Sequence, residues 1–201
     1  YFSDVISWAA IGARTTESQI HRQLVSGLSM PVGYKNGTNG DIKIAIQAML
    51  SSSQPHNFTG ITKDGEIALI QTKGNTDTHV ILRGSNSGPN YDRKIVAKIS
   101  DDLIDANANS SAIMVDCSHG NSCKDYRKQV DVVEDVCDQL NSGSKIMGVM
   151  LESNINEGAQ KLADGKNLEY GVSVTDSCLS LEQTVPLLEK LSDAVSISRS
   201  K

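Results

Sequence analysis

Six polar side chains follow directly on short apolar runs spread along the chain. Three are cations and three are metal-ligating types: Arg14, Lys35, Arg83, and His119, Glu152, Asp176. Arginine offers a fork of donors and lysine a compact charge, so the cations suit a phosphate and a carboxylate. One imidazole and two carboxylates suit a divalent ion such as Mn, Fe, Co or Zn. A metal beside three cations predicts an anionic substrate whose carbonyl or hydroxyl is polarised by the ion.

The elements that must position these side chains alternate between strand-like and helix-like segments. We expect strands within 6–13, 31–35, 79–83, 112–116, 146–151 and 171–175, and helices around 20–28, 42–50, from about 92, 122–140 and 181–198. Repeated strand–helix units predict a parallel sheet with crossover helices, and near-continuous apolar strands suit burial on both faces. One further segment differs: residues 57–62 and 66–72 flank Lys63-Asp64-Gly65, which predicts a β-hairpin over 57–72.

Two architectures fit this order, an open doubly wound sheet and a closed (β/α)8 barrel. In a barrel, the carboxyl ends of all strands converge on one face, so side chains distant in sequence can share one pocket. An open sheet would spread six successive strand ends along a ridge. The six side chains therefore favour the TIM barrel.

Each side chain also has an ordinary structural interpretation. A strand-end Arg or Lys is often a salt-bridge partner, and Asp176, within Thr175-Asp176-Ser177, could cap the last helix. Asp116 either orients the metal site or serves packing. His21, His56 and His79 are expected to be structural or solvent-facing.

Composition narrows the class of protein. The 201 residues include 19 Lys+Arg and 24 Asp+Glu, a formal charge of −5, which argues against nucleic-acid and anionic-membrane partners. The sequence has no apolar run near the ~20 residues that span a bilayer. Four cysteines without a C-x-x-C pair predict reduced thiols in the cytoplasm. The start at Tyr1, without Met or signal-peptide layout, indicates a cut into a longer chain.

Six motifs together resemble one enzyme family. They are GARTTESQ at 12–19, PVGYKNGT at 31–38, ILRG at 81–84, DCSHGNS at 116–122, GVMLES at 148–153 and VTDSC at 174–178. In this order they resemble the feedback-regulated microbial and fungal type I 3-deoxy-D-arabino-heptulosonate 7-phosphate (DAHP) synthases, over essentially the whole chain. The resemblance implies that residues 1–201 form the C-terminal portion of one catalytic barrel, with strands four to eight and the 57–72 hairpin inserted before the sixth.

The resemblance also implies a reaction and its site residues. Phosphoenolpyruvate would condense with erythrose 4-phosphate in an aldol-like step, giving DAHP and phosphate, the first step of the shikimate pathway to aromatic amino acids. Backbone near Ala13 and the side chains of Arg14, Lys35 and Arg83 would bind phosphoenolpyruvate. His119, Glu152 and Asp176 would be three of four metal ligands, with a cysteine of the missing N-terminal part as the fourth. Lys35 and a metal-bound water are the candidates for moving protons.

Regulation and assembly follow from the same resemblance. Members are inhibited by an aromatic amino acid, and the corresponding pocket would be formed by Ser29, Phe58, Gly60 and Ile70. Glycine at position 60 leaves room for a hydroxyl, which favours tyrosine over phenylalanine. A cytoplasmic homo-oligomer is implied. Two alternatives stay open: the related synthase that uses arabinose 5-phosphate, and an inactive fragment that lacks the N-terminal half of the barrel.

Overall fold

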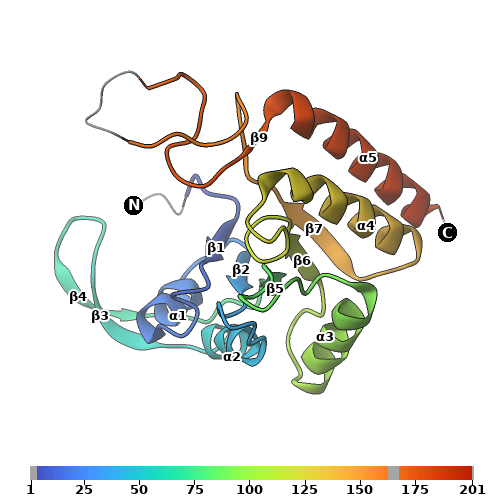
Figure 1. Ribbon diagram of the computed structural model, residues 1–201. Helices are drawn as coiled ribbons and strands as arrows, with labels where there is room; N and C mark the ends of the chain where they lie inside the picture. The colour runs from blue at the N-terminus through green and yellow to red at the C-terminus, as the bar shows by residue number, and fades with distance from the viewer. Residues whose placement is uncertain (1–3, 163–167, 201) are drawn as a thin grey trace. The chain divides into compact units, whose positions relative to one another are not determined.

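A computed structural model describes residues 4–162 and 168–200 of the chain (Figure 1). The chain forms two compact units. The first unit comprises Tyr1–Leu82 and Lys98–Met114, and the second comprises Arg83–Ala97 and Val115–Lys201. Helix α3 (Arg93–Asp105) and strand β6 (Ile113–Asp116) each have residues in both units. Among the described residues, none of the helices combines the length and the hydropathy that crossing a membrane requires.

The first unit is built on parallel strands with helices between them. Strands β1 (Ala9–Ile11), β2 (Val32–Lys35) and β5 (Thr78–Leu82) are neighbours in that order, and α1 (Gln19–Ser26) and α2 (Lys43–Ser52) are the crossover helices. Every residue of β5 is buried, as expected for a strand covered on both faces. The predicted strand–helix order and the α/β class with a parallel sheet are confirmed here, whereas closure into a (β/α)8 barrel stays a prediction.

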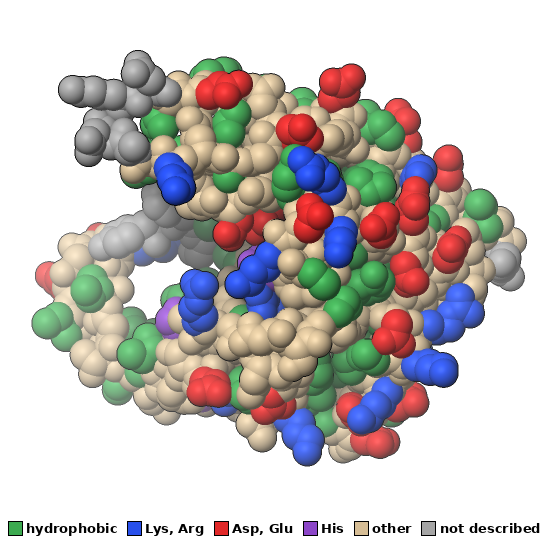
Figure 2. All heavy atoms as spheres, in the orientation of Figure 1, with side chains coloured by type: hydrophobic (Ala, Val, Ile, Leu, Met, Phe, Trp, Pro, Cys, Tyr) green, Lys and Arg blue, Asp and Glu red, His purple; other side chains and the backbone are tan. Residues whose placement is uncertain are grey.

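The predicted hairpin is also confirmed in the first unit. Strands β3 (Asn57–Ile61) and β4 (Ile67–Gln71) pair antiparallel, with Phe58 opposite Ile70. Gly65 lies in the turn at φ 85°, a region that glycine enters without the steric penalty of a Cβ. Figure 2 shows green apolar side chains on this hairpin, and Ile61, Ile67 and Leu69 are exposed.

The second unit combines a strand pair with two long helices. Its elements after β6 are η1 (Tyr126–Lys128), α4 (Gln129–Asn141), β7 (Ile146–Met150), β8 (Ser153–Asn154), β9 (Leu179–Ser180) and α5 (Leu181–Arg199). The Cys117 amide donates to the Met150 carbonyl at 2.9 Å, so the carboxyl ends of β6 and β7 lie side by side. Helices α4 and α5 pack along each other (Figure 1), and a Lys190–Glu134 ion pair joins their exposed sides.

The helix predicted over 122–140 begins later than expected. Cys123 and Lys124 have φ values of 54° and 64°, which an α-helix cannot accommodate. Residues 119–124 therefore form turns, and Asp125 accepts a hydrogen bond from the Arg127 amide to start the 3-10 turn η1. The apolar spacing that suggested the helix is correct only from Gln129 onward.

The strand predicted over 171–175 is wrong. Gly171 turns the chain at φ 80°, and among the described residues this segment forms one isolated bridge, from Ser173 to Ala159. The Ser173 hydroxyl accepts from the Thr175 amide at 3.2 Å, a local bond that competes with strand pairing. The extended pairing lies further on, where β9 runs parallel to β8 with Ser153 opposite Leu179.

Candidate metal and anion site

Three side chains of the second unit gather where the sequence predicts a metal site. His119, Glu152 and Asp176 each offer a ligand atom, and these atoms lie within 4.8 Å of one another. They come from the loop after β6, the end of β7 and the turn before β9. An ion held at ~2.1 Å from each ligand would separate the ligand atoms by roughly 3 to 4 Å, so inward movement of about 1 Å suffices. The nitrogen and oxygen donors suit a first-row divalent cation.

His119 sits in a strained loop that aims its ring at the cluster. Its φ of 55° is unusual for a residue with a side chain, and such strain concentrates at functional sites. Its Nδ1 lies 3.0 Å from Oδ2 of the fully buried Asp116, at an angle outside hydrogen-bond geometry, and its Nε2 lies 3.8 Å from Glu152 Oε1. Nε2 therefore faces the Glu152 carboxylate and is the ring nitrogen placed to serve as a ligand. Asp116 is fully buried and lies beside the His119 ring, so its two interpretations, orientation of the site and packing, both stay predictions.

Glu152 is held at both its carboxylate and its backbone. The Ser118 hydroxyl donates to Oε2 at 2.7 Å, which leaves Oε1 facing His119. The Glu152 amide donates to Gln129 Oε1 at 2.8 Å, and the Gln129 side-chain amide donates to the Glu152 carbonyl at 3.1 Å. Sequence reasoning missed both Ser118 and Gln129. Ser118 lies inside a quoted motif, whereas Gln129 was hidden in a stretch interpreted only for its apolar spacing.

Asp176 completes the cluster from an exposed turn. Its alternative role as the cap of the last helix is wrong, because Ser180 caps α5 in a capping box with Gln183. The neighbouring Cys178 thiol lies 3.5 Å from the Asp176 carbonyl, and partial burial raises the Cys178 pKa above its ordinary value. Asp176 is therefore free of the capping role and available as a ligand.

Arg83 belongs to the same unit as the three metal-ligating residues. Its side chain is largely buried, at 8% exposure, and its carbonyl accepts from the Gly120 amide at 3.0 Å. The chain at Gly84 and Gly120 is packed backbone to backbone: a Cβ on Gly84 would lie 2.4 Å from the Asn121 amide nitrogen. This close approach fixes the residue after β5 against the loop that carries His119.

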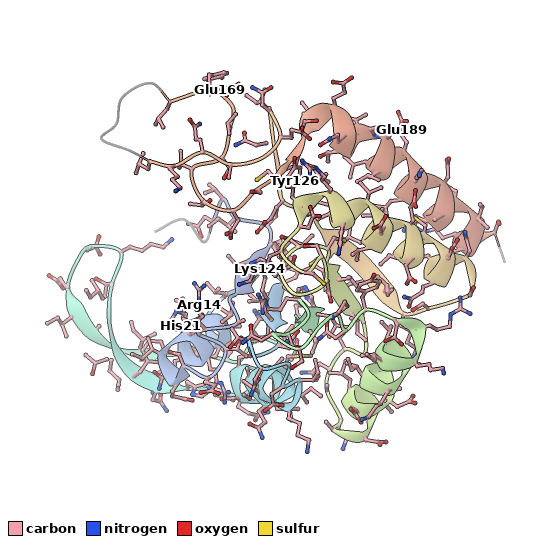
Figure 3. The ribbon with its side chains drawn as sticks, in the orientation of Figure 1. Arg14, His21, Lys124, Tyr126, Glu169 and Glu189 are labelled. Carbon is pink, nitrogen blue, oxygen red and sulfur yellow. The ribbon has the colours of Figure 1, made fainter. Side chains whose placement is uncertain are left out.

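The remaining cations lie in the first unit. Arg14 is exposed and Lys35 half-buried at the end of β2 (Figure 3 labels Arg14). The Thr16 hydroxyl donates to the Lys35 carbonyl at 2.7 Å and contacts the Gly12 carbonyl at 3.1 Å, which ties the loop bearing Ala13 and Arg14 to the end of β2. The structure thus groups two cations in one unit and Arg83 with the metal-ligating residues in the other. Convergence of all six stays a prediction.

The predicted regulatory residues fall mostly on one face of the hairpin. Phe58 and Ile70 are opposite each other, and a Cβ on Gly60 would lie 2.6 Å from Ile70 Cγ1 and 3.6 Å from Phe58 Cε2. Ile70 therefore fills the space beside Gly60, and the room for a hydroxyl that the sequence predicts at position 60 is not open in this structure. Ser29 lies in an exposed bend after α1.

Comparison with known proteins assigns the chain to a family. The model of the DAHP synthetase I family matches residues 1–189. A phospho-2-dehydro-3-deoxyheptonate aldolase of Haemophilus influenzae is 52% identical over 202 residues, covering 100% of this chain and 55% of that protein. A tyrosine-inhibited aldolase of the same name from Schizosaccharomyces pombe is 50% identical over 204 residues, covering 99% of this chain and 55% of the relative.

A solved structure agrees with these relatives. The phospho-2-dehydro-3-deoxyheptonate aldolase of Francisella tularensis has a TM-score of 0.95 and 49% identity, covering 98% of this chain and 57% of that one. The chain thus spans just over half the length of the relatives it matches. Because the family model and the 50% identities extend over nearly all of its residues, the chain belongs to the DAHP synthetase I family.

Proposed function

We propose that the complete natural protein condenses phosphoenolpyruvate with erythrose 4-phosphate to give DAHP and phosphate. The observation that carries the proposal is the cluster of His119, Glu152 and Asp176, whose ligand atoms lie within 4.8 Å of one another in a chain of this family. A divalent ion bound there would supply Lewis-acid polarisation of the aldehyde oxygen. The choice among Mn, Fe, Co and Zn stays open, because imidazole and carboxylate ligands suit all four.

The chain's cations would bind and orient the anionic substrate. In the proposed role, Arg14, Lys35 and Arg83 hold the carboxylate and phosphate of phosphoenolpyruvate, assisted by backbone near Ala13, and counter charge that develops during the reaction. A nearly buried guanidinium such as that of Arg83 is worth more to an anion than an exposed one, because water screens it less. Lys35 would transfer a proton as the catalytic residue.

The proposed reaction forms one C–C bond and breaks the C2–O bond to phosphate. C3 of phosphoenolpyruvate attacks the aldehyde carbon and forms the new C–C bond, while the aldehyde oxygen takes up a proton. Water adds at C2 and loses a proton. The new C2 hydroxyl then gives up its remaining proton and becomes the ketone oxygen as the C2–O bond to phosphate breaks and inorganic phosphate leaves. Holding the two reactants in line makes the first step effectively unimolecular.

Phosphate release by the complete natural protein tests this proposal. We expect turnover with Mn²⁺ and none with EDTA. His119→Ala should lower turnover by more than the ~10- to 100-fold that loss of an outer metal partner costs. His56→Ala, which removes a ring bonded to the Ser51 carbonyl in the first unit, is the matched control and should retain activity. Turnover that survives EDTA, or faster turnover with arabinose 5-phosphate than with erythrose 4-phosphate, would contradict the proposal.

We also propose that the hairpin face formed by Phe58, Gly60 and Ile70, together with Ser29, binds an inhibiting aromatic amino acid, tyrosine rather than phenylalanine. The support is the pairing of Phe58 with Ile70 and the position of Gly60 beside them; because Ile70 Cγ1 fills the space next to Gly60, a tyrosine hydroxyl at this point requires Ile70 to move. Tyrosine should raise the melting temperature of the complete protein, and Gly60→Ser should reduce that shift. Stabilisation by phenylalanine alone would exclude tyrosine as the effector.

A further inference from the structure

The side chain of Gln129 pairs with the backbone of a metal-ligating residue at the point where strand β7 has just ended. Gln129, the first residue of α4, is fully buried. Its Oε1 accepts from the Glu152 amide at 2.8 Å, and its Nε2 donates to the Glu152 carbonyl at 3.1 Å. A neighbouring strand would supply such a donor and acceptor, so one side-chain amide substitutes for a strand at this residue.

Two further hydrogen bonds hold the backbone carbonyl and one carboxylate oxygen of Glu152 in place. The Leu179 amide donates to the same Glu152 carbonyl at 2.9 Å, and the Ser118 hydroxyl holds carboxylate Oε2 at 2.7 Å. Once the backbone and one carboxylate oxygen are fixed, Oε1 has little freedom and stays near His119 Nε2, 3.8 Å away. Because Gln129 is fully buried, a water molecule could replace its two hydrogen bonds to Glu152 only by displacing packed atoms.

We infer that Gln129 is a positioning residue that sets the affinity and geometry of the metal site through the Glu152 backbone. The inference rests on the proposed metal-dependent function. Gln129 is not one of the three candidate ligands, and it would act through its bonds to the Glu152 backbone. Outer partners that orient metal ligands change metal affinity by about 10- to 100-fold when removed. We expect a change of that size for Gln129, although it acts on the ligand's main chain and not on its carboxylate.

A matched pair of variants separates positioning from general stability. Gln129→Met removes both bonds while filling a similar volume. Gln139→Met removes another buried glutamine of the same helix, whose Nε2 donates to the Tyr91 carbonyl at 2.7 Å. Mn²⁺ affinity and the visible spectrum of bound Co²⁺ are measured on the complete protein, below the melting temperature of each variant. Gln129→Met should raise the Mn²⁺ Kd by about 10- to 100-fold and alter the Co²⁺ spectrum. Gln139→Met should leave the Mn²⁺ Kd within about twofold of wild type and the Co²⁺ spectrum unaltered, since Gln139 bonds to Tyr91 and Asp135 and not to Glu152.

Gln129→Asn covers the case in which the Met variant does not fold. It keeps the amide but is one methylene shorter, so it cannot reach both backbone groups at once, and its Kd should lie between those of wild type and Gln129→Met. Wild-type Kd and Co²⁺ spectrum in a folded Gln129 variant, or an equal loss in Gln139→Met, would overturn the inference and leave the proposed function intact. If the wild-type protein binds neither Mn²⁺ nor Co²⁺, the proposed function and this inference both fail.

Discussion

A methyl group placed on Gly84 should disrupt the contact that holds Arg83 against the His119 loop. Gly84 has φ 72°, where residues with a side chain are strained, and its added Cβ would lie 2.4 Å from both the Asn121 amide nitrogen and the Gly120 carbonyl carbon. Both of those atoms are backbone. They cannot swing aside as a flexible side chain would, so the loop itself must move.

The magnitude follows from two separable costs. The left-handed backbone conformation costs a non-glycine residue about 1–2 kcal/mol. Overpacking a tight contact typically costs about 1–3 kcal/mol more. Gly143 has φ 83°, but a Cβ there would meet no described atom within 4 Å. Gly143→Ala should therefore show the conformational cost alone, and Gly84→Ala should exceed it by about 1–3 kcal/mol.

Urea unfolding of the two variants beside the wild-type protein measures this difference. A movement of the loop should also disturb the metal ligands, so Gly84→Ala should weaken Mn²⁺ binding while Gly143→Ala leaves it unchanged. An equal loss of unfolding free energy in both variants would refute the reasoning, because it would show that the backbone at Gly120 and Asn121 yields without cost.

Four further outcomes are expected. Ser180→Ala should lower the free energy of unfolding in urea by about 1 kcal/mol, because it removes the α5 cap. Arg14→Ala should raise the KM for phosphoenolpyruvate in the phosphate-release assay and leave the Mn²⁺ Kd unchanged, because the proposed role of Arg14 is to bind the substrate and not the metal; a weakened Kd would contradict that role. Burial raises the pKa of Tyr34 to about 12, so the unfolded state ionises first and stability is lost as pH rises from about 10 through about 12. Urea titrations at alkaline pH should show a smaller loss for Tyr34→Phe. Cys123 is exposed, whereas burial raises the pKa of Cys117 well above its usual range, so a thiol reagent should label Cys123 in the folded protein and Cys117 only after unfolding, as mass mapping can test.

Most of the elements, and the clustering of His119, Glu152 and Asp176, could be predicted because both depend on local patterns. The fully buried strand at Thr78–Leu82 ends in the apolar run Val80-Ile81-Leu82, and the hairpin has an Asp-Gly signal at its turn. His119 and Glu152 lie within three residues of the ends of β6 and β7, so locating these strands also located two residues of the cluster. A ligand at a strand end needs no long-range information beyond the sheet itself.

The departures occur where local hydrogen bonds compete with an element. The loop from His119 to Lys124 contains three residues at positive φ, which no apolar spacing reveals, and the predicted helix therefore began too early. The segment 171–175 has the β-branched residues of a strand, but its serine hydroxyl bonds to backbone two residues on and Gly171 turns the chain. Strand propensity reflects packing against neighbours, so it does not show whether a partner strand is present.

The sequence pattern singled out Asp116 as a neighbour of the candidate metal site but not Ser118 or Gln129. Ser118 and Gln129 bond to Glu152, and Asp116 lies beside His119, through contacts that form only in the folded second unit. All three are buried polar residues, and a buried polar group costs stability unless it is bonded. Each of them contacts a candidate metal ligand. Polar residues at strand ends thus indicate candidate ligands, whereas buried polar residues that touch those ligands indicate how their geometry is maintained.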